Sequence, residues 1–439
     1  MALFTFRGGV HPFDGKALSK DKPIEEYKPK GDLVYPLSQH IGAPAKAIVE
    51  KGQRVLMGER IAEAGGFVSA CICASVSGTV KGIEKRRTVT GDMVDCIIIE
   101  NDGFYEKAEP LTDKTFEQMS REEVLAVIRD AGITGMGGAG FPTHVKLSPK
   151  EPEKIDTIIV NCSECEPYLT SDYRKMLEEP DKLVHGLEIM LSLFDNARGV
   201  LAVEDNKPDC IKLLKEKTAG KERISVAALK TKYPQGSERQ LIFAVTGREI
   251  NSKMLPADAG CVVNNTDTVI AINNAVTEGE PLIHRIVTVT GDAVKDPRNF
   301  KVYTGTDYSE LIEAAGGFVT EPAKIISGGP MMGFAMFDLH VPVTKSSSAL
   351  LCMSTDEVAK WEPSACINCG RCVDVCPSRL IPSHIADHAA HFNEEEFLGL
   401  YGMECVECGC CSYVCPAKRQ LAQSIKTMRR LVMAKRKKK

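Results

Sequence analysis

Eight cysteines near the C-terminus fall into two copies of one spacing, and this spacing is typical of iron–sulfur chemistry. In each copy two residues separate the first three cysteines, three residues precede the fourth, and a proline follows directly. Such a run holds a [4Fe-4S] cluster with three thiolates, while the fourth cysteine ligates the neighbouring cluster. The eight predicted ligands are Cys366, Cys369, Cys372, Cys376, Cys405, Cys408, Cys411 and Cys415. The spacing therefore predicts electron transfer.

Crossed ligation divides these ligands into two sets. One set is Cys366, Cys369, Cys372 and Cys415, and the other is Cys405, Cys408, Cys411 and Cys376. A zinc ribbon is a weaker interpretation, because structural zinc sites use two ligand pairs and need no third C-x-x-C step. Cys410 does not fit the frame, and we expect a packed thiol there. Cys162 and Cys165 form a separate C-x-x-C pair, for which packing is the simpler interpretation and a redox pair the alternative.

Length and composition are those of an ordinary soluble, multidomain protein. The chain has 439 residues, 43% of them hydrophobic, and a net charge of −4, so no nucleic-acid partner is expected. No stretch approaches the roughly 18 apolar residues of a membrane-spanning helix, and the N-terminus lacks the features of a secretory signal. The 17 cysteines with cluster spacing fit a reducing cytoplasm.

A glycine-rich loop follows a predicted helix in the first half of the chain. Ser120 and Glu123 form a capping box, and the helix that they start stops at Gly132. The loop at 135–140 then reads G-x-G-x-x-G. A Rossmann fingerprint must follow a strand and open a helix, so that interpretation is the weaker one. Glycines permit close backbone approach and Lys146 adds a positive charge, a combination that fits a flavin nucleotide.

Three further segments contain dense sets of polar residues. Residues 161–168 follow an apolar run that predicts a strand, and residues 233–238 lie between polar flanks. Asn264, Asn265 and Thr266 directly precede an apolar helix, whose free N–H groups would point at an anion. We interpret them as the phosphate end of a nucleotide site. Simple N-capping is an equally good explanation for the two asparagines.

Together these segments resemble the NADH- and FMN-binding subunit of respiratory complex I. The matching blocks are the glycine loop with Lys146, Asn161-x-Ser-Glu-x-Glu-Pro, Tyr233-x-x-Gly-x-Glu238 and Asn264-Asn265-x-Asp-Thr, in that family's order. A Gly-Gly-Val-His-Pro arm at 8–12, a carrier-like N-terminal domain and the two-cluster C-terminus extend the likeness. The whole chain resembles the RnfC family, whose members belong to the Rnf complex, an ion-translocating ferredoxin:NAD oxidoreductase.

The resemblance implies a role for each matching residue. Phe141, Glu166 and Glu238 align with the nicotinamide nucleotide site, and the two glutamates are the predicted catalytic residues. The remaining matches, which would bind FMN, are Gly135, Gly137, Gly138, Lys146, Asn161, Ser163, Glu164, Tyr233, Gly236, Asn264, Asn265 and Thr266. Three positions depart from the relatives' pattern, and they are Met136, Ser163 and Ser237, in place of Arg, Asp and Glu. These changes affect the expected NADH affinity and flavin potential.

The expected fold class is multidomain α/β, with six regions. They are an N-terminal arm at 1–30, a lipoyl-like barrel-sandwich domain at 31–110, a Rossmann-like FMN- and NADH-binding α/β domain at 111–283, a β-grasp (SLBB) domain at 284–345, an α-helical ferredoxin-type domain with two clusters at 346–425, and a basic tail at 426–439. Short β-like runs between glycine turns indicate the barrel. Its carrier-type turn at 63–67 contains no lysine, so no swinging arm is expected.

The C-terminal tail is both basic and periodic. Its apolar residues Ile425, Met428, Leu431 and Val432 lie near one face of a possible amphipathic helix. Such a helix would touch anionic lipid or an acidic partner. A solvated, frayed end is the equally weighted alternative.

The resemblance implies an electron-input subunit on the cytoplasmic face of the membrane, in a ferredoxin:NAD oxidoreductase coupled to Na⁺ or H⁺ translocation. It would exchange a hydride between NADH and FMN, and single electrons between FMN and two [4Fe-4S] clusters. Its partners would be the other subunits of an Rnf-type complex, NADH and, indirectly, ferredoxin. A cobalamin reductase of bacterial microcompartments and a non-catalytic iron–sulfur conduit are the alternatives. The sequence fixes neither the direction of electron flow nor the coupling cation.

Overall fold

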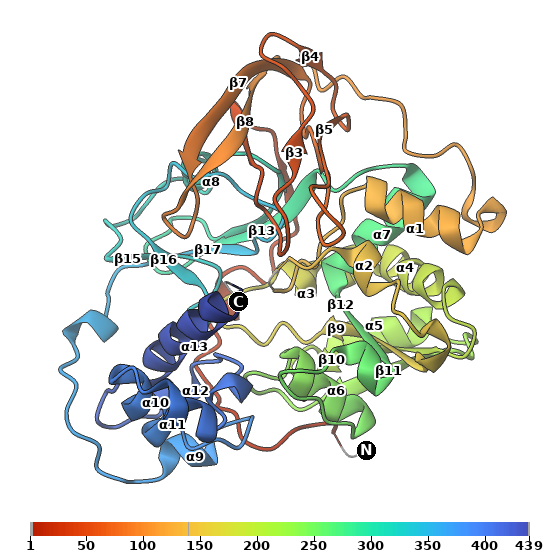
Figure 1. The fold of residues 1–439 in the computed structure, drawn as a ribbon. Helices are drawn as coiled ribbons and strands as arrows, with labels where there is room; N and C mark the ends of the chain where they lie inside the picture. The colour runs from red at the N-terminus through yellow and green to blue at the C-terminus, as the bar shows by residue number, and fades with distance from the viewer. Residues whose placement is uncertain (1–2, 139, 438–439) are drawn as a thin grey trace.

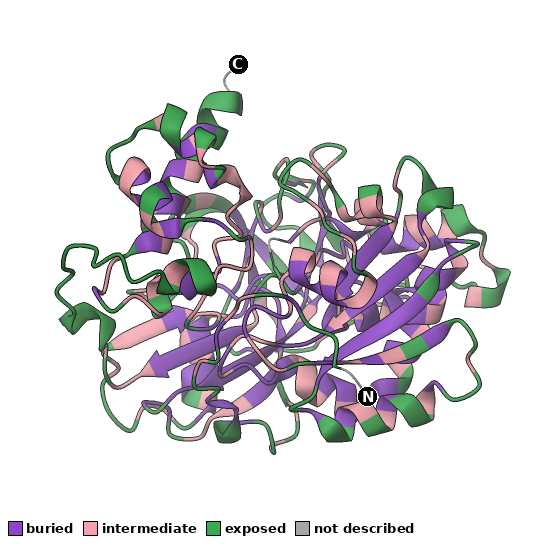
Figure 2. Cartoon of the chain, turned by 90° about the horizontal axis from the view of Figure 1, so that it is seen from below, coloured by how far each residue is buried: buried purple, intermediate pink, exposed green. Residues whose placement is uncertain are grey.

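Four packed units make up the structure, a computed structural model that describes residues 3–138 and 140–437 (Figure 1). A barrel-sandwich domain, a parallel-sheet domain, a β-grasp domain and a C-terminal helical domain follow one another along the chain. This order confirms the expected multidomain α/β fold class. Buried residues fill the sheets and the inner faces of the helices (Figure 2). No helix among the described residues is long and apolar enough to cross a membrane.

Two small antiparallel sheets form the barrel-sandwich domain. One has the strand order β2-β8-β7-β4 and the other the order β3-β5-β6. Their inner faces enclose an apolar core that includes Tyr35, Ile61 and Ile97. The strands are β2 (Leu33–Pro36), β3 (Lys46–Ala47), β4 (Arg54–Val55), β5 (Arg60–Glu63), β6 (Ile72–Cys73), β7 (Gly78–Arg87) and β8 (Met93–Asn101).

A four-stranded parallel sheet with the order β11-β10-β9-β12 is the centre of the next domain. Helices connect its strands and cover both faces, as parallel pairing requires. The strands are β9 (Thr157–Cys162), β10 (Arg198–Glu204), β11 (Ile224–Leu229) and β12 (Cys261–Asn265). The helices are α1 (Arg121–Asp130), α2 (Thr143–Lys146), α3 (Ser171–Glu178), α4 (Pro180–Ser192), α5 (Pro208–Lys217), α6 (Glu238–Thr246) and α7 (Thr266–Glu278).

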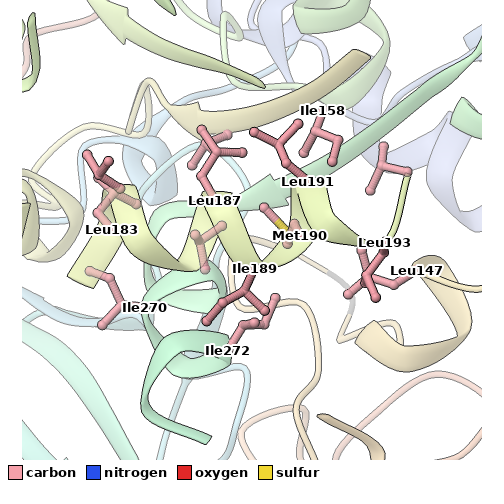
Figure 3. Packing of buried hydrophobic residues seen from close by; sticks show 14 of the residues in the cluster. Leu147, Ile158, Leu183, Leu187, Ile189, Met190, Leu191, Leu193, Ile270 and Ile272 are labelled. Atoms are coloured by element: carbon pink, nitrogen blue, oxygen red, sulfur yellow. The ribbon is translucent and has the colours of Figure 1, made fainter. Parts of the chain in front are cut away.

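Helix α4 packs its apolar face on this sheet. Leu187 and Leu191 point toward Ile158 of β9 (Figure 3). On the opposite face Leu241 of α6 packs in a cluster with Ile159. Burial of one such side chain contributes about 1.5–3 kcal/mol. Cores on both faces hold the strands firmly, so their carboxyl ends form a rigid edge.

The helix before the glycine loop forms as the sequence predicts. The hydroxyl of Ser120 accepts a hydrogen bond from the Glu123 N–H at 3.3 Å, and the Glu123 carboxylate accepts from the Ser120 N–H at 2.8 Å. After α1, Gly132 adopts a φ of 64°, a left-handed conformation that suits glycine at the end of a helix. The capping box and the helix stop are confirmed.

A six-stranded sheet with the order β1-β14-β13-β17-β15-β16 forms the β-grasp domain. Strand β1 comes from the N-terminal arm, and β17 lies between β13 and β15. The sheet extends past residue 345 because β17 supplies the buried Leu350 and Cys352 to its core. The elements are β1 (Glu25–Tyr27), β13 (His284–Thr290), β14 (Arg298–Tyr303), α8 (Tyr308–Ala314), β15 (Lys324–Ser327), β16 (Phe334–Met336) and β17 (Ala349–Met353).

Short helices and one long terminal helix form the last domain. They are α9 (Arg371–Asp374), α10 (Pro382–Ala390), α11 (Glu394–Gly399), α12 (Cys410–Tyr413) and α13 (Leu421–Lys437). Ile425, Met428 and Val432 of α13 are buried, as the predicted amphipathic helix requires, whereas Leu431 is 41% exposed. Leu431 precedes Val432 by one position and therefore turns about 100° away from it. Lys438 and Lys439 of the basic tail lie outside the described residues.

Candidate cofactor sites

The predicted flavin residues meet at the carboxyl edge of the parallel sheet. At the end of β9 the Asn161 side-chain amide donates to the carbonyl of Gly236 at 2.8 Å. The hydroxyl of Thr266, the first residue of α7, donates to the Asn161 carbonyl at 3.2 Å. In open parallel sheets ligands bind outside this edge. Three of the four sequence blocks are therefore in direct contact.

The glycine loop lies beside the start of α7. A Cβ added to Gly137 would lie 3.0 Å from the side chain of Asn265, whereas one added to Gly138 would meet nothing within 4 Å. The N–H of Gly135 donates to the carbonyl of Phe141 at 2.8 Å and closes the loop. The loop thus leaves room for a ligand next to the first turn of α7. The Asn265 side chain accepts the Asp267 N–H at 2.9 Å and is an N-cap, as the alternative proposed.

Lys146 brings a positive charge to the same edge. Its Nζ donates to the carbonyl of Val263 at 2.8 Å and lies 3.3 Å from Oε1 of Glu238. Glu238 is the first residue of α6 and is partly exposed. The structure therefore places the predicted lysine and one predicted catalytic glutamate together.

Buried polar atoms without partners surround this edge. Oγ of Ser163, Oδ1 of Asn264 and both side-chain amide atoms of Gln235 are buried and make no hydrogen bond within the described part of the chain. An unsatisfied buried polar group costs about 1–3 kcal/mol. A bound ligand with donors and acceptors would satisfy them, so these residues fit a polar nucleotide such as FMN. Sequence reasoning did not single out Gln235, because an isolated glutamine has no distinguishing pattern.

Glu164 has a structural partner at the base of the predicted site. Its carboxylate accepts the N–H groups of Asp172 and Tyr173 at 2.7 and 3.3 Å, at the start of α3. Asp172 in turn accepts from the Asn265 side chain at 2.6 Å. Burial, the Glu164 carboxylate and the carboxylate of Asp267 raise the pKa of Asp172 to about 8. The contact of Glu164 with α3, and hence with Asn265, was not predicted.

Glu166, the other predicted catalytic residue, lies against the β-grasp domain. Its Oε1 accepts the N–H groups of Met331 and Met332 at 2.7 and 3.1 Å. A Cβ on Gly329 would lie 2.1 Å from Cγ of Glu166, so only glycine fits there. Oε2 of Glu166 makes no hydrogen bond within the ranges described. One oxygen therefore joins two domains, and the other remains available to a nucleotide.

Tyr233 connects the nucleotide edge to the C-terminal domain. Its buried hydroxyl donates to the backbone carbonyl of Cys408 at 2.8 Å. The thiol of Cys165 accepts the N–H of Gly236 at 3.2 Å, and Cys165 also packs with Tyr233, Cys408 and Cys410 in one cluster. Tyr233 was predicted to bind the cofactor. Its hydroxyl instead binds the loop of a predicted cluster ligand.

The two cysteine runs adopt the same backbone conformation. Asn368 and Glu407, which occupy equivalent positions, have φ values of 55° and 58°. Gly370 and Gly409 follow at 77° and 79°, and each precedes a four-residue helix. Non-glycine residues rarely adopt positive φ, and such residues gather at functional sites. The repeat in sequence is therefore also a repeat in structure.

One of the two predicted ligand sets is grouped and largely buried. Burial raises the pKa of Cys405 to about 11, and the neighbouring thiols of Cys408 and Cys376 add to this shift. Burial also raises the pKa of Cys411, with further contributions from Cys405, Cys408 and Cys376. Cys376, from the first run, thus lies with the thiols of the second, as crossed ligation requires. This grouping fits a shared cluster, although no three side chains among the described residues converge to hold a single metal ion.

Family models match the four domains in chain order. They are the RnfC Barrel sandwich hybrid domain at residues 4–104, the Nuo51 FMN-binding domain at 128–274, the SLBB domain at 286–335 and a 4Fe-4S dicluster domain at 365–418. A solved NAD⁺-reducing [NiFe]-hydrogenase in the air-oxidized state is similar in fold, with a TM-score of 0.51 and 18% identity. That match covers 72% of this chain and 66% of the other.

Two relatives, both RnfC proteins, align over most of the chain. The relative from the proton-translocating ferredoxin:NAD(+) oxidoreductase complex of Clostridium ljungdahlii is 47% identical, over 88% of this chain and 84% of its own. The relative from the Na(+)-translocating ferredoxin:NAD(+) oxidoreductase complex of Acetobacterium woodii is 43% identical, over 99% and 98%. The chain belongs to the RnfC family. The expected family is thereby confirmed, and the FMN-binding and dicluster matches agree with the unpartnered polar edge and the grouped thiols of this RnfC protein.

Proposed function

We propose that this RnfC protein is the peripheral electron-input subunit of a membrane-bound ferredoxin:NAD oxidoreductase, placed on the cytoplasmic face and coupled to Na⁺ or H⁺ translocation. It exchanges a hydride with NADH and single electrons with its partner subunits. The relatives' names and the matches to FMN-binding and dicluster domains support this function. Ferredoxin is an indirect partner, which exchanges electrons through the other subunits.

The observation that carries the proposal is the hydrogen bond between Tyr233 and Cys408. It joins the loop that follows the nucleotide edge to a cluster-ligand loop at 2.8 Å, through buried atoms. Arg239 of α6 also donates to the carboxylate of Glu404 at 3.0 Å, and Gln240 contacts the carbonyl of Pro377 at 3.5 Å. A flavin site and a cluster that exchange electrons must lie close together. The contact provides that closeness within one chain.

The residues of the edge have separate tasks in this proposal. Lys146 and the unpartnered amide of Asn264 bind the polar parts of FMN, and Gly137 and Gly138 admit its backbone-side approach. Phe141, Glu238 and Oε2 of Glu166 line the nicotinamide nucleotide. FMN, when bound, would convert the two-electron chemistry of nicotinamide into single-electron chemistry. The chain's own residues only orient the two nucleotides and exclude water.

Burial assigns an order to the two clusters. The set Cys405, Cys408, Cys411 and Cys376 lies next to Tyr233 and would exchange electrons with the flavin. In the other set Cys366 and Cys369 are exposed. That set would therefore face the redox partner. Its surroundings include the exposed Ile367 and Tyr413, apolar residues that suit a protein contact.

Anaerobic titration with NADH tests the proposed function. Purified protein is expected to contain FMN and about eight iron and eight sulfide per chain, as two cubane clusters require. NADH should bleach both the flavin absorbance and the broad cluster absorbance, and reduced clusters should give a paramagnetic signal. Stoichiometric zinc in place of iron and sulfide would end the proposal. Clusters without FMN, and unaffected by NADH, would instead leave a non-catalytic conduit.

A further inference from the structure

The N-terminal arm runs between the parallel-sheet domain and the C-terminal domain (Figure 1). It first lies along the sheet edge, where the N–H of Phe4 donates to the carbonyl of Ala228 at 3.1 Å and Lys230 donates back at 2.9 Å. Val10 and Tyr233 then exchange two backbone hydrogen bonds of 2.8 and 2.9 Å. The arm is thus attached to the loop that contacts Cys408.

Two glycines of the arm press against the ligand loop of Cys376. The N–H of Gly9 donates to the carbonyl of Val375 at 2.9 Å. A Cβ on Gly8 would lie 2.9 Å from that carbonyl and 3.0 Å from the carbonyl of Cys376. Gly8 and Gly9 have φ values of 83° and 84°, which other residues rarely adopt. Only glycine permits this approach.

Lys16 then inserts its ammonium group beneath the predicted flavin loop. Nζ donates to the carbonyls of Glu164, Glu166 and Leu169 at 2.9, 3.1 and 2.5 Å, and lies 3.8 Å from the Glu164 carboxylate. An ammonium has three donors, and all three are used here. Lys16 is only 8% exposed, so its burial is costly unless these contacts form. The lysine gathers three carbonyls as a bound cation would.

The loop held by Lys16 has a strained backbone. Glu164 and Tyr168 have φ values of 47° and 69°, in the left-handed region. Each such residue costs on the order of 1–3 kcal/mol and persists only when its surroundings impose it. Gly15, directly before Lys16, packs so closely that an added Cβ would lie 2.4 Å from the Tyr168 ring. Lys16 and Gly15 are the parts of the arm that impose this conformation.

We propose that residues 4–22 act as a strap that fixes the loop 163–169 relative to the ligand loop of Cys376, with Lys16 as its positioning residue. The strap then continues to the β-grasp domain, where the hydroxyl of Ser19 lies 2.7 Å from that of Thr170 and Lys22 pairs with Asp296. The benefit to electron exchange rests on the proposed function. The effect of the strap on the loop does not.

Replacement of Lys16 by methionine tests the strap, because methionine keeps an unbranched side chain and removes the three donors. In the full-length protein we expect amide hydrogen exchange at 164–170 to become at least tenfold faster. The FMN dissociation constant should rise at least tenfold, with iron content unchanged. Lys20→Met is the matched control, since Lys20 lies four residues further along the arm with its side chain exposed. It should change neither measurement.

Gly15→Ala provides a second, milder variant that leaves the charge of Lys16 in place. It should speed exchange at 164–170 by several fold, and it carries the test alone if Lys16→Met does not fold. Unchanged exchange in every folded variant would overturn the strap. Wild-type protein that binds no FMN but shows faster exchange in the variants would reject the proposed function and keep the strap.

Discussion

The hydroxyl of Tyr233 donates a 2.8 Å hydrogen bond to the backbone carbonyl of Cys408, and both groups are buried. The carbonyl of the same tyrosine accepts the N–H of Val10 and lies 3.8 Å from the thiol of Cys410. One residue therefore contacts the N-terminal strap, the nucleotide edge and a cluster-ligand run. A change at this position should separate flavin chemistry from cluster chemistry.

Tyr233→Phe should slow the transfer of reducing equivalents to the clusters. The phenyl ring keeps the packing, but the buried carbonyl of Cys408 loses its donor, at a cost of about 1–3 kcal/mol. We expect NADH to reduce the flavin absorbance at the wild-type rate and the cluster signals several-fold more slowly. Stopped-flow absorbance with freeze-quench paramagnetic resonance measures both rates. Tyr401→Phe, at a 71% exposed site of the same domain, is the control. Equal slowing of both phases would contradict the assigned junction.

The raised pKa of Asp172 predicts a pH-dependent stability. Its pKa is about 8 in the fold, against 3.8 for an ordinary aspartate. Between these values the folded chain holds a proton that the unfolded chain releases, so this contribution is present at low pH and lost as pH rises through 8. Asp172→Asn removes the titrating group. The melting temperature of the wild type relative to this variant should therefore fall from pH 5.5 to pH 8.5.

Asp181→Asn is the control for that titration, because Asp181 is exposed and pairs only with Lys217 on the surface. Its melting temperature should follow the wild type at every pH. A difference between wild type and Asp172→Asn that stays constant with pH would show that Asp172 is ionised across the range. The pKa assigned to the buried carboxyl group would then be wrong.

Local spacing predicted the parts of the molecule that depend on neighbouring residues. The cysteine runs appear as two equal backbone repeats, with Asn368 and Glu407 in the same conformation. The Ser120 capping box forms, and Cys410 is a buried, packed thiol. Each of these features is fixed by residues a few positions apart. The chain could therefore be interpreted there without any tertiary information.

Features that depend on distant segments could not be predicted in the same way. Lys16 reaches carbonyls about 150 positions later in the chain, and nothing around it distinguishes it from other lysines. Strand β17 enters the β-grasp sheet from beyond residue 345, because its apolar run fits between β13 and β15. The partner of Glu166 in the Met331 loop is likewise a tertiary contact. Only the folded chain brings these groups together.

Glu166→Gln should impair NADH oxidation and leave FMN in place. Oε1 of Glu166 holds the N–H groups of Met331 and Met332, and a glutamine carbonyl can accept the same two bonds. The glutamine amide would then replace the second carboxylate oxygen, turning an acceptor into a donor toward the nucleotide. We expect the KM for NADH to rise about tenfold, as a lost charged hydrogen bond of about 1.5 kcal/mol implies.

Glu166→Ala separates the two oxygens of the same residue. It removes both acceptors, so the amides of Met331 and Met332 should exchange faster in this variant and remain protected in Glu166→Gln. Since charged hydrogen bonds are roughly twice as strong as neutral ones, part of that protection should already weaken in the glutamine variant. Full NADH oxidation by Glu166→Gln, together with rapid exchange at 331–332 in the alanine variant, would restrict Glu166 to joining the domains. A higher KM in both variants would place its second oxygen at the nicotinamide nucleotide.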